Sequence, residues 1–140
     1  MKQICVIDGQ GGGIGSAIIK QLKELFVEKV EIIALGTNAI ATAQMLKAKA
    51  NRGASGENAV VRTVPGANVI IGPVGIIIAH AMMGEVTPKM VEAIAVSPAK
   101  KLLLPISQEK VVIVGMVPTP LPHLIESLIK NNLKNFLNEQ

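Results

Sequence analysis

The sequence predicts an α/β protein built on a doubly wound, mostly parallel β-sheet with helices on both faces. Three observations support this fold class. Strand-like and helix-like segments alternate from the amino terminus. The strand-like segments are apolar throughout, as in parallel sheets that are covered on both faces. A glycine-rich stretch, DGQGGGIG (residues 8–15), joins the first strand to the first helix. At 140 residues, the chain is expected to form one domain over residues 1–140.

The chain begins with two strands separated by a helix. Residues 2–7 (KQICVI) read as a short buried strand. Apolar residues spaced by three and four predict an amphipathic helix over 15–29. The apolar run VEIIALG predicts the second strand over 30–36.

A second helix is predicted over 37–53, followed by a loop over 54–57. Either Thr37 or Asn38 serves as its N-cap, since both side chains can accept a hydrogen bond from the first turn. Gly53 is expected as the C-cap, because glycine adopts without strain the left-handed conformation that ends many helices.

The middle of the chain predicts two further strands, over 58–62 and 67–71. The link between them, TVPG, is too short for a crossover helix, so the two strands are expected to be antiparallel or not adjacent. Residues 72–84 fit either a continuation of the strand or a short buried helix that ends at Gly84. We expect the helix, because the length and the closing glycine suit it.

The C-terminal part predicts a helix, two strands and a final helix. Residues 87–97 carry Thr87 as N-cap and proline at the first helical position. Residues 100–106 and 110–116 are apolar and read as buried strands. The last segment, 118–140, has one apolar stripe at helical spacing, formed by Leu121, Leu124, Ile125, Leu128, Ile129, Leu133 and Phe136.

The composition excludes several classes of protein. The net charge is +4, but the basic residues are scattered and the chain has no tryptophan or tyrosine, so we expect no nucleic-acid binding. The longest apolar stretch, NVIIGPVGIIIAHAMM, is broken by Pro73 and glycines, so we expect no membrane span and a cytoplasmic protein. The single cysteine, Cys5, lies inside a strand pattern and is expected to be a small buried hydrophobe.

The glycine-rich stretch points to a bound phosphate. The N-terminus of a helix favours anions, and close approach of a phosphate requires missing side chains. The pattern G-x-x-x-G-x-G is met in full by Gly9, Gly13 and Gly15, with Ile14 before the last. A P-loop is excluded because no Lys-Ser/Thr pair follows the glycines. The expected ligand-binding residues in this stretch are Asp8, Gly9, Gln10, Gly11, Gly12, Gly13, Ile14 and Gly15.

On these residues the sequence resembles the cofactor half of the short-chain dehydrogenases and reductases, whose loop reads T-G-x-x-x-G-I-G. The resemblance implies a Rossmann-like fold in which Gly9, Gly13, Ile14 and Gly15 line the pyrophosphate and adenosine ribose of NAD or NADP. Asp8 stands where that family has threonine. That family's Tyr-x-x-x-Lys signature is missing because the chain has no tyrosine. The whole chain also resembles a family of short bacterial Rossmann-like proteins of unassigned function.

The end of the second strand normally contacts the adenosine ribose, where an acidic residue favours NAD and an arginine favours NADP. This chain has Gly36, Thr37 and Asn38 there, which choose neither cofactor. These side chains can bind a ribose or phosphate, or can merely cap the following helix.

Asp8 is the only aspartate of the chain, and a bare carboxylate beneath the loop would repel a pyrophosphate. Either it accepts hydrogen bonds from the N–H groups of the loop, or it shares a Mg²⁺ ion with the phosphates. We expect the first arrangement, because the resemblance implies a loop-bonding residue here and no metal.

Catalytic residues are not evident in the sequence. His80 and Glu85 are the candidates, with His80 either facing the ligand as an acid or base or lying buried in the core. No metal site is expected from the spacing of histidine and cysteine. With 49% hydrophobic residues, the chain is expected to form a homo-oligomer. The two functions considered are a small NAD(P)-dependent oxidoreductase whose site is completed by oligomerisation, and a non-catalytic nucleotide-binding sensor or accessory subunit.

Overall fold

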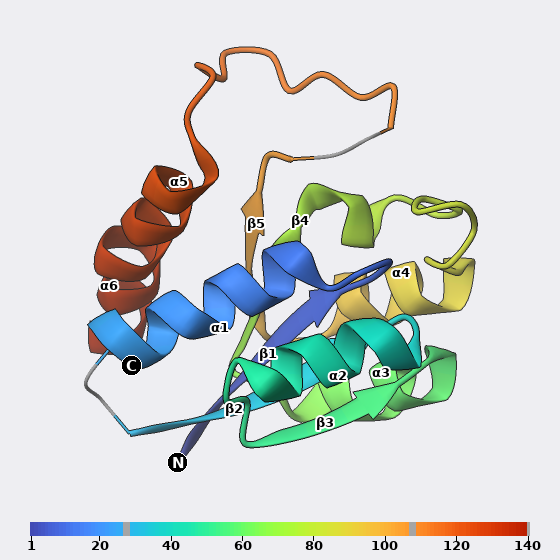
Figure 1. Ribbon diagram of the computed structural model, residues 1–140, viewed down its shortest axis with the longest axis horizontal. Coiled ribbons are helices and arrows are strands. Elements are labelled where there is room, and N and C mark those ends of the chain that lie inside the picture. The colour runs from blue at the N-terminus through green and yellow to red at the C-terminus, as the bar shows by residue number, and fades with distance from the viewer. Residues whose placement is uncertain (27–28, 107–108, 140) are drawn as a thin grey trace.

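The computed structural model describes residues 1–26, 29–106 and 109–139. Its strands form one sheet of order β3-β2-β1-β4-β5, in which every described pair is parallel (Figure 1). The strands are β1 (Lys2–Asp8), β2 (Val30–Gly36), β3 (Arg52–Ser55), β4 (Val69–Pro73) and β5 (Lys100–Leu104). The chain adds β2 and β3 on one side of β1 and then crosses to add β4 and β5 on the other side. The direction of winding therefore reverses between β1 and β4. The predicted α/β, Rossmann-like doubly wound fold is therefore confirmed.

Helices cover both faces of the sheet. One face carries α1 (Gly13–Leu25), α2 (Ala39–Lys47) and the C-terminal helix. The C-terminal helix is continuous through α5 (Leu121–Ser127), a π-helical stretch (Leu128–Leu133) and α6 (Lys134–Asn138). The other face carries α3 (Glu57–Thr63) and α4 (Pro88–Val96). Successive residues of β1 feed the two cores in turn, with Ile4 and Val6 on the first face and Cys5 and Ile7 on the second.

Most of the predicted elements are present. The strands expected over 2–7, 30–36, 67–71 and 100–106 correspond to β1, β2, β4 and β5, and the helix over 87–97 corresponds to α4. Thr87 caps α4, and Asn38 rather than Thr37 caps α2, accepting from the Ala41 N–H at 2.8 Å. The helix expected over 15–29 starts at Gly13 and ends at Leu25; residues 27–28 lie outside the described part of the chain. The apolar stripe of 118–140 faces the core, while residue 140 lies outside the described part.

The strand predicted over 58–62 is wrong, because these residues form α3. The true third strand is β3, where a loop and the C-cap Gly53 were expected. All four residues of β3 are exposed at the edge of the sheet, so no apolar pattern marks it. Because β3 and β4 are parallel and lie on opposite sides of β1 within the sheet, the chain between them must form a crossover. This requirement overrides the strand preference of Val60 and Val61.

Two further expectations are wrong. Residues 72–84 form neither one helix nor one strand: Gly72 and Pro73 end β4, a 3₁₀ turn follows over Val74–Ile77, and the rest is a compact loop. His80, Met82 and Met83 have positive φ there, which breaks any helix. Residues 110–116 are not a strand but an exposed, irregular segment that projects from the body of the protein (Figure 1). No described helix is long and apolar enough to cross a membrane.

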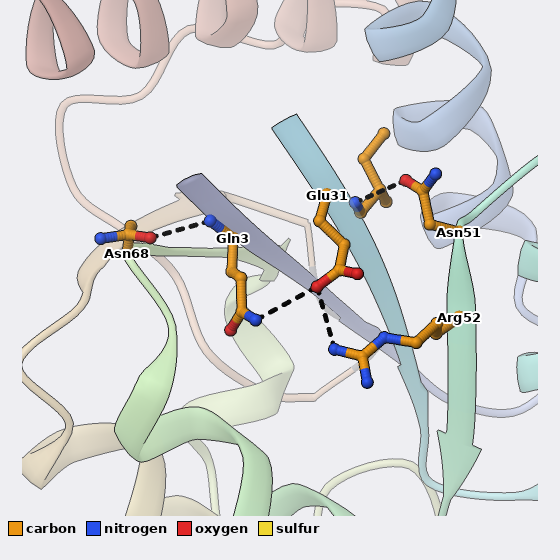
Figure 2. Close-up of polar contacts among 6 residues, drawn as sticks. Gln3, Glu31, Asn51, Arg52 and Asn68 are labelled. Atoms are coloured by element: carbon orange, nitrogen blue, oxygen red, sulfur yellow. Dashed lines mark hydrogen bonds and ion pairs between the residues drawn. The ribbon is translucent and has the colours of Figure 1, made fainter. Parts of the chain in front are cut away.

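Polar side chains join the strands at their amino ends, opposite the glycine loop. Glu31 accepts hydrogen bonds from the side chains of Gln3 and Arg52, and Asn68 accepts one from the Gln3 N–H (Figure 2). Asn51 accepts one from the backbone of β2. These contacts hold neighbouring strands together at their amino-terminal ends, and the glycine loop lies at the carboxyl-terminal end of the sheet.

We expect Ile129→Ala to lower the free energy of unfolding by about 2–5 kcal/mol, because the side chain is buried between the C-terminal helix and the sheet. Urea denaturation followed by circular dichroism measures the change. Lys130→Ala, one residue along on the exposed side, is the control and should change stability by less than about 0.5 kcal/mol. Equal effects of the two variants would show that the helix does not pack as described.

Candidate functional site

The glycine loop lies at the carboxyl end of β1, beside the point where the winding of the sheet reverses. Ligands of doubly wound sheets bind at this point. A cavity of about 220 Å³ opens here. It is lined by residues 8–14, by Pro73 at the end of β4 and Gly75 after it, by Ala81 and Met82, and by Ile106 and Glu109 after β5. The structure therefore brings the predicted loop residues to the wall of a cavity, with the exception of Gly15.

Asp8 shapes the loop from below. Its Oδ1 accepts the Gly9 N–H at 2.8 Å, and its Oδ2 accepts the Gly15 N–H at 2.7 Å. Burial raises the pKa of the Asp8 carboxyl, and hydrogen bonds from the N–H groups of Gly15, Gly9 and Ile14 oppose that rise. The expectation that Asp8 accepts hydrogen bonds from the loop is confirmed. Among the described residues, no three His, Cys, Asp or Glu side chains are grouped so that they could hold a metal ion.

Three glycines of the loop are required by the fold itself. Gly12 has φ +73°, and a methyl group added there would lie 2.8 Å from the Cα of Ala41 in α2. A methyl group at Gly9 would meet the side chains of Thr37, Met82 and Glu85. One at Gly15 would lie 2.9 Å from the Cβ of Asp8. These glycines allow the loop to pass close to its neighbours.

Gly11 and Gly13 are different, because nothing in the protein requires them to be glycine. A methyl group at either position would meet no atom of the described residues within 4 Å, and neither glycine has a positive φ. Their backbone N–H groups have no acceptor within the part of the chain that the structure describes. Both line the cavity, and Gly13 begins α1. At both positions, a backbone N–H without an acceptor among the described residues therefore lies beside the cavity, at the positive end of a helix.

The end of β2 is already engaged by protein groups. The Glu85 Oε1 accepts hydrogen bonds from the Gln10 N–H at 2.8 Å, the Thr37 hydroxyl at 2.6 Å and the Asn38 amide at 2.9 Å. The Asn38 amide also donates to the Gln10 carbonyl at 3.0 Å. Gly36 has no space for a side chain, because a methyl group there would contact Thr42. Thr37 and Asn38 thus hold Glu85 beside the glycine loop and do not line the cavity.

Glu85 is held as a carboxylate by these donors. Burial alone would raise its pKa, but the hydrogen bonds from Thr37, Gln10 and Asn38 outweigh that effect, and the net pKa is lowered. Sequence reasoning named Glu85 as a catalytic candidate but did not predict that it joins the glycine loop to the end of β2. No sequence signal was available, because Glu85 is 75 residues from Gln10.

His80 does not reach the cavity. Its side chain is exposed, so the buried position considered for it is wrong, and it is not among the described residues that line the cavity. The cause is the left-handed backbone of the 78–86 loop, which turns His80 outward while Met82 lies against Gly9. The same loop holds the Met82 N–H 3.0 Å from the Glu109 Oε1. The cavity residues that sequence reasoning missed are Pro73, Gly75, Ala81, Met82, Ile106 and Glu109.

Cys5 lies beneath the site and takes no part in it. The side chain is fully buried in the core shared with α3 and α4. Burial raises the pKa of the Cys5 thiol to about 12; among the smaller effects, the charge of Arg52 lowers this pKa and the charge of Glu31 raises it. The thiol stays protonated at neutral pH and behaves as the small hydrophobe that was expected.

The division of the glycines predicts two different outcomes for the same substitution. Gly12→Ala should lower the free energy of unfolding by about 2 kcal/mol or more, because its left-handed backbone and the nearby Ala41 do not tolerate a methyl group. Gly13→Ala should leave stability unchanged or raise it by about 0.5–1 kcal/mol, because alanine favours the helix. Urea titration of both variants measures the difference, and similar losses would refute this division.

The lowered pKa of Glu85 predicts a pH-dependent contribution to stability. A depressed carboxyl pKa stabilises the fold above the pKa of the unfolded chain, and the stabilisation is lost as the pH falls through the folded pKa. Glu85→Gln should therefore be less stable than the parent at pH 7, and the difference should shrink as the pH falls below about 4.5. Thermal unfolding across pH 3–7 measures this, with Glu24→Gln, an exposed carboxylate of α1, as control. A difference independent of pH would show that charge on Glu85 is unimportant.

Comparison with known proteins identifies the family of the chain but not its ligand. No curated protein and no solved structure matches the sequence. The model of one family, described as a domain of unknown function (DUF3842), matches residues 3–137. This match runs from β1 into α6 and includes the glycine loop, Glu85 and the C-terminal helix. The chain therefore belongs to the DUF3842 family.

Proposed function

We propose that the chain binds a dinucleotide, NAD or NADP, with the pyrophosphate over Gly11 and Gly13. The observation that carries the proposal is that no described residue requires glycine at these two positions, and that both line the cavity with backbone N–H groups for which the described residues supply no acceptor. Gly13 begins α1 and Gly11 lies two residues before it, so both lie at the helix N-terminus, where the helix dipole favours negative charge. A bound phosphate accounts for the missing side chains and for the free donors together.

The dimensions of the cavity suit one part of such a ligand. At about 220 Å³ the cavity is smaller than most small-molecule sites, which measure about 300–1,000 Å³. It has room for the pyrophosphate and part of the group attached to it. The adenosine end would then lie outside the cavity, over the end of β2, where Glu85 is held.

We infer that Glu85 takes the part of the acidic residue that binds the adenosine ribose in NAD sites. Its Oε1 is occupied by three protein donors, and its Oε2 has no donor among the described residues. A carboxylate oxygen accepts from a ribose hydroxyl and repels the 2′-phosphate of NADP. This favours NAD over NADP.

The polar groups in the cavity favour a protein that binds its ligand without catalysing a reaction. The described lining contains no lysine, arginine or histidine, and its carboxylates belong to Asp8 and Glu109. Asp8 is committed to the loop N–H groups. Hydride transfer to or from a carbonyl substrate needs a positioned acid or base. A nucleotide-binding sensor or accessory subunit therefore fits one chain better than an oxidoreductase, which would require a second chain to complete its site.

The test is a panel of NAD, NADH, NADP, NADPH and ATP, measured by thermal shift and calorimetry on the parent and on Gly13→Val. A ligand at 100 times its dissociation constant stabilises the folded state by about 2.7 kcal/mol. NAD or NADH should raise the melting temperature of the parent more than the NADP forms do. In Gly13→Val, the valine side chain would fill the phosphate position, so binding should be lost while the fold remains.

Gly66→Val is the matched control. Gly66 also has free space around it, but it lies near Gln3, at the other end of the sheet. This variant should bind the ligand as the parent does. Equal binding by the parent and Gly13→Val, or no response of the parent to any dinucleotide, would contradict the proposal.

A further inference from the structure

A strongly apolar segment projects from the body of the protein between β5 and α5. We call residues 110–117, KVVIVGMV, the arm. Every residue of the arm is exposed, with Val112 at 85% and Val114 at 93%. The arm extends beyond the helices and the sheet before the chain returns as α5 (Figure 1). Exposed apolar surface of this kind marks an interaction site.

The arm has the properties of a buried strand. Val111, Val112, Ile113 and Val114 are consecutive β-branched residues, and apolar side chains occupy both alternating faces. The N–H groups of Val112, Ile113 and Val114 have no acceptor among the described residues. Within the arm, the Met116 N–H donates to the Ile113 carbonyl and closes a turn at Val114 and Gly115, which must open if the whole arm is to form a strand. No strand of the described part of the chain pairs with the arm, and its side chains are exposed.

The sheet offers a matching vacancy at β5. This strand is the last of the sheet, and the Lys100 N–H points toward β4, where it donates to the Asn68 carbonyl. In a parallel ladder the N–H groups alternate in direction, so those of Lys101 and Leu103 point outward. A groove of about 310 Å³ runs along this edge, between residues 101–105 and the Leu124 and Leu128 side chains of the C-terminal helix.

The arm cannot reach the β5 edge of its own chain. A parallel neighbour needs a connection of about a dozen residues, but only residues 105–109 separate β5 from the arm. An antiparallel neighbour would descend about 20 Å along β5. The C-terminal helix starts near the carboxyl end of β5 and runs back to its amino end, where Lys100 Nζ lies 5.9 Å from the Phe136 ring centre. The three residues 118–120 span only about 10 Å and cannot make the return.

We propose that the arm of a second copy of this chain adds to the β5 edge as a sixth strand, and that the exchange is reciprocal. Each chain has one arm and one β5 edge with this groove beside it, so two chains can exchange arms reciprocally and the assembly closes. Lys110 is the single charge of the arm and lies at its end, so an apolar run enters the groove. Pro118 and Pro120 follow the arm and lack N–H donors, which limits the pairing to the arm.

The oligomeric state of the full chain tests the proposal. Light scattering over a range of concentrations should show a dimer for the parent. Val112→Lys combined with Val114→Lys should weaken the dimer by about tenfold or more, because both side chains are exposed in one chain and buried only in the pair. Circular dichroism should show an unchanged fold. Val96→Lys, an equally simple change at an exposed valine of α4, should leave the dimer intact.

Cross-linking distinguishes arm-to-edge pairing from contact between two arms. In a Cys5→Ala background, a chain with Val114→Cys is mixed with a chain with Leu103→Cys and treated with a short bis-maleimide. Cross-links between the two kinds of chain are expected. A monomeric parent, an unchanged dimer in the double lysine variant, or cross-links of Val114→Cys chains only with each other would overturn the proposal.

Discussion

The Asp8 carboxylate, at the carboxyl end of the central strand, determines the shape of the site. It is buried, and its two oxygens accept hydrogen bonds from the N–H groups of Gly9 and Gly15, at the two ends of the loop. Burial of a charge is unfavourable unless donors offset it, so the loop must keep the form that supplies these donors. The backbone N–H groups of the loop therefore fall into two sets. Those of Gly9 and Gly15 serve the protein, while those of Gly11 and Gly13 stay available to a ligand.

A second carboxylate ties the loop to the rest of the site. Glu85 joins Gln10 of the glycine loop to Thr37 and Asn38 at the end of β2, and it comes from a segment in which several non-glycine residues have positive φ. Strained backbone of this kind persists where the surroundings impose it, and it clusters at functional sites. The same segment places Met82 against Gly9. The glycine loop, the end of β2 and the 78–86 segment are therefore held together beside the cavity by Glu85 and Met82.

Local sequence patterns predict the centre of this fold better than its edges. β1, β2, β4 and β5 were predictable because buried parallel strands are apolar throughout. β3 was not, since an exposed edge strand carries no such pattern. The valines of α3 and of the arm both favour strands, but α3 is helical because a crossover is needed there, and the arm has no neighbour within its own chain. Asp8 and the loop were readable from spacing; the position of Glu85 depends on tertiary contacts and was not.

The central claim is that Gly11 and Gly13 face a bound phosphate while Gly9 and Gly15 serve Asp8. Titration of ¹⁵N-labelled protein with NAD, followed through the backbone amide signals in NMR spectra, tests it most directly. The account predicts that the amides of Gly11 and Gly13 shift most within the loop, because they acquire a charged acceptor, and that those of Gly9 and Gly15 shift less because they keep Asp8. Saturable shifts elsewhere in the protein with the Gly11 and Gly13 amides unmoved would contradict the account.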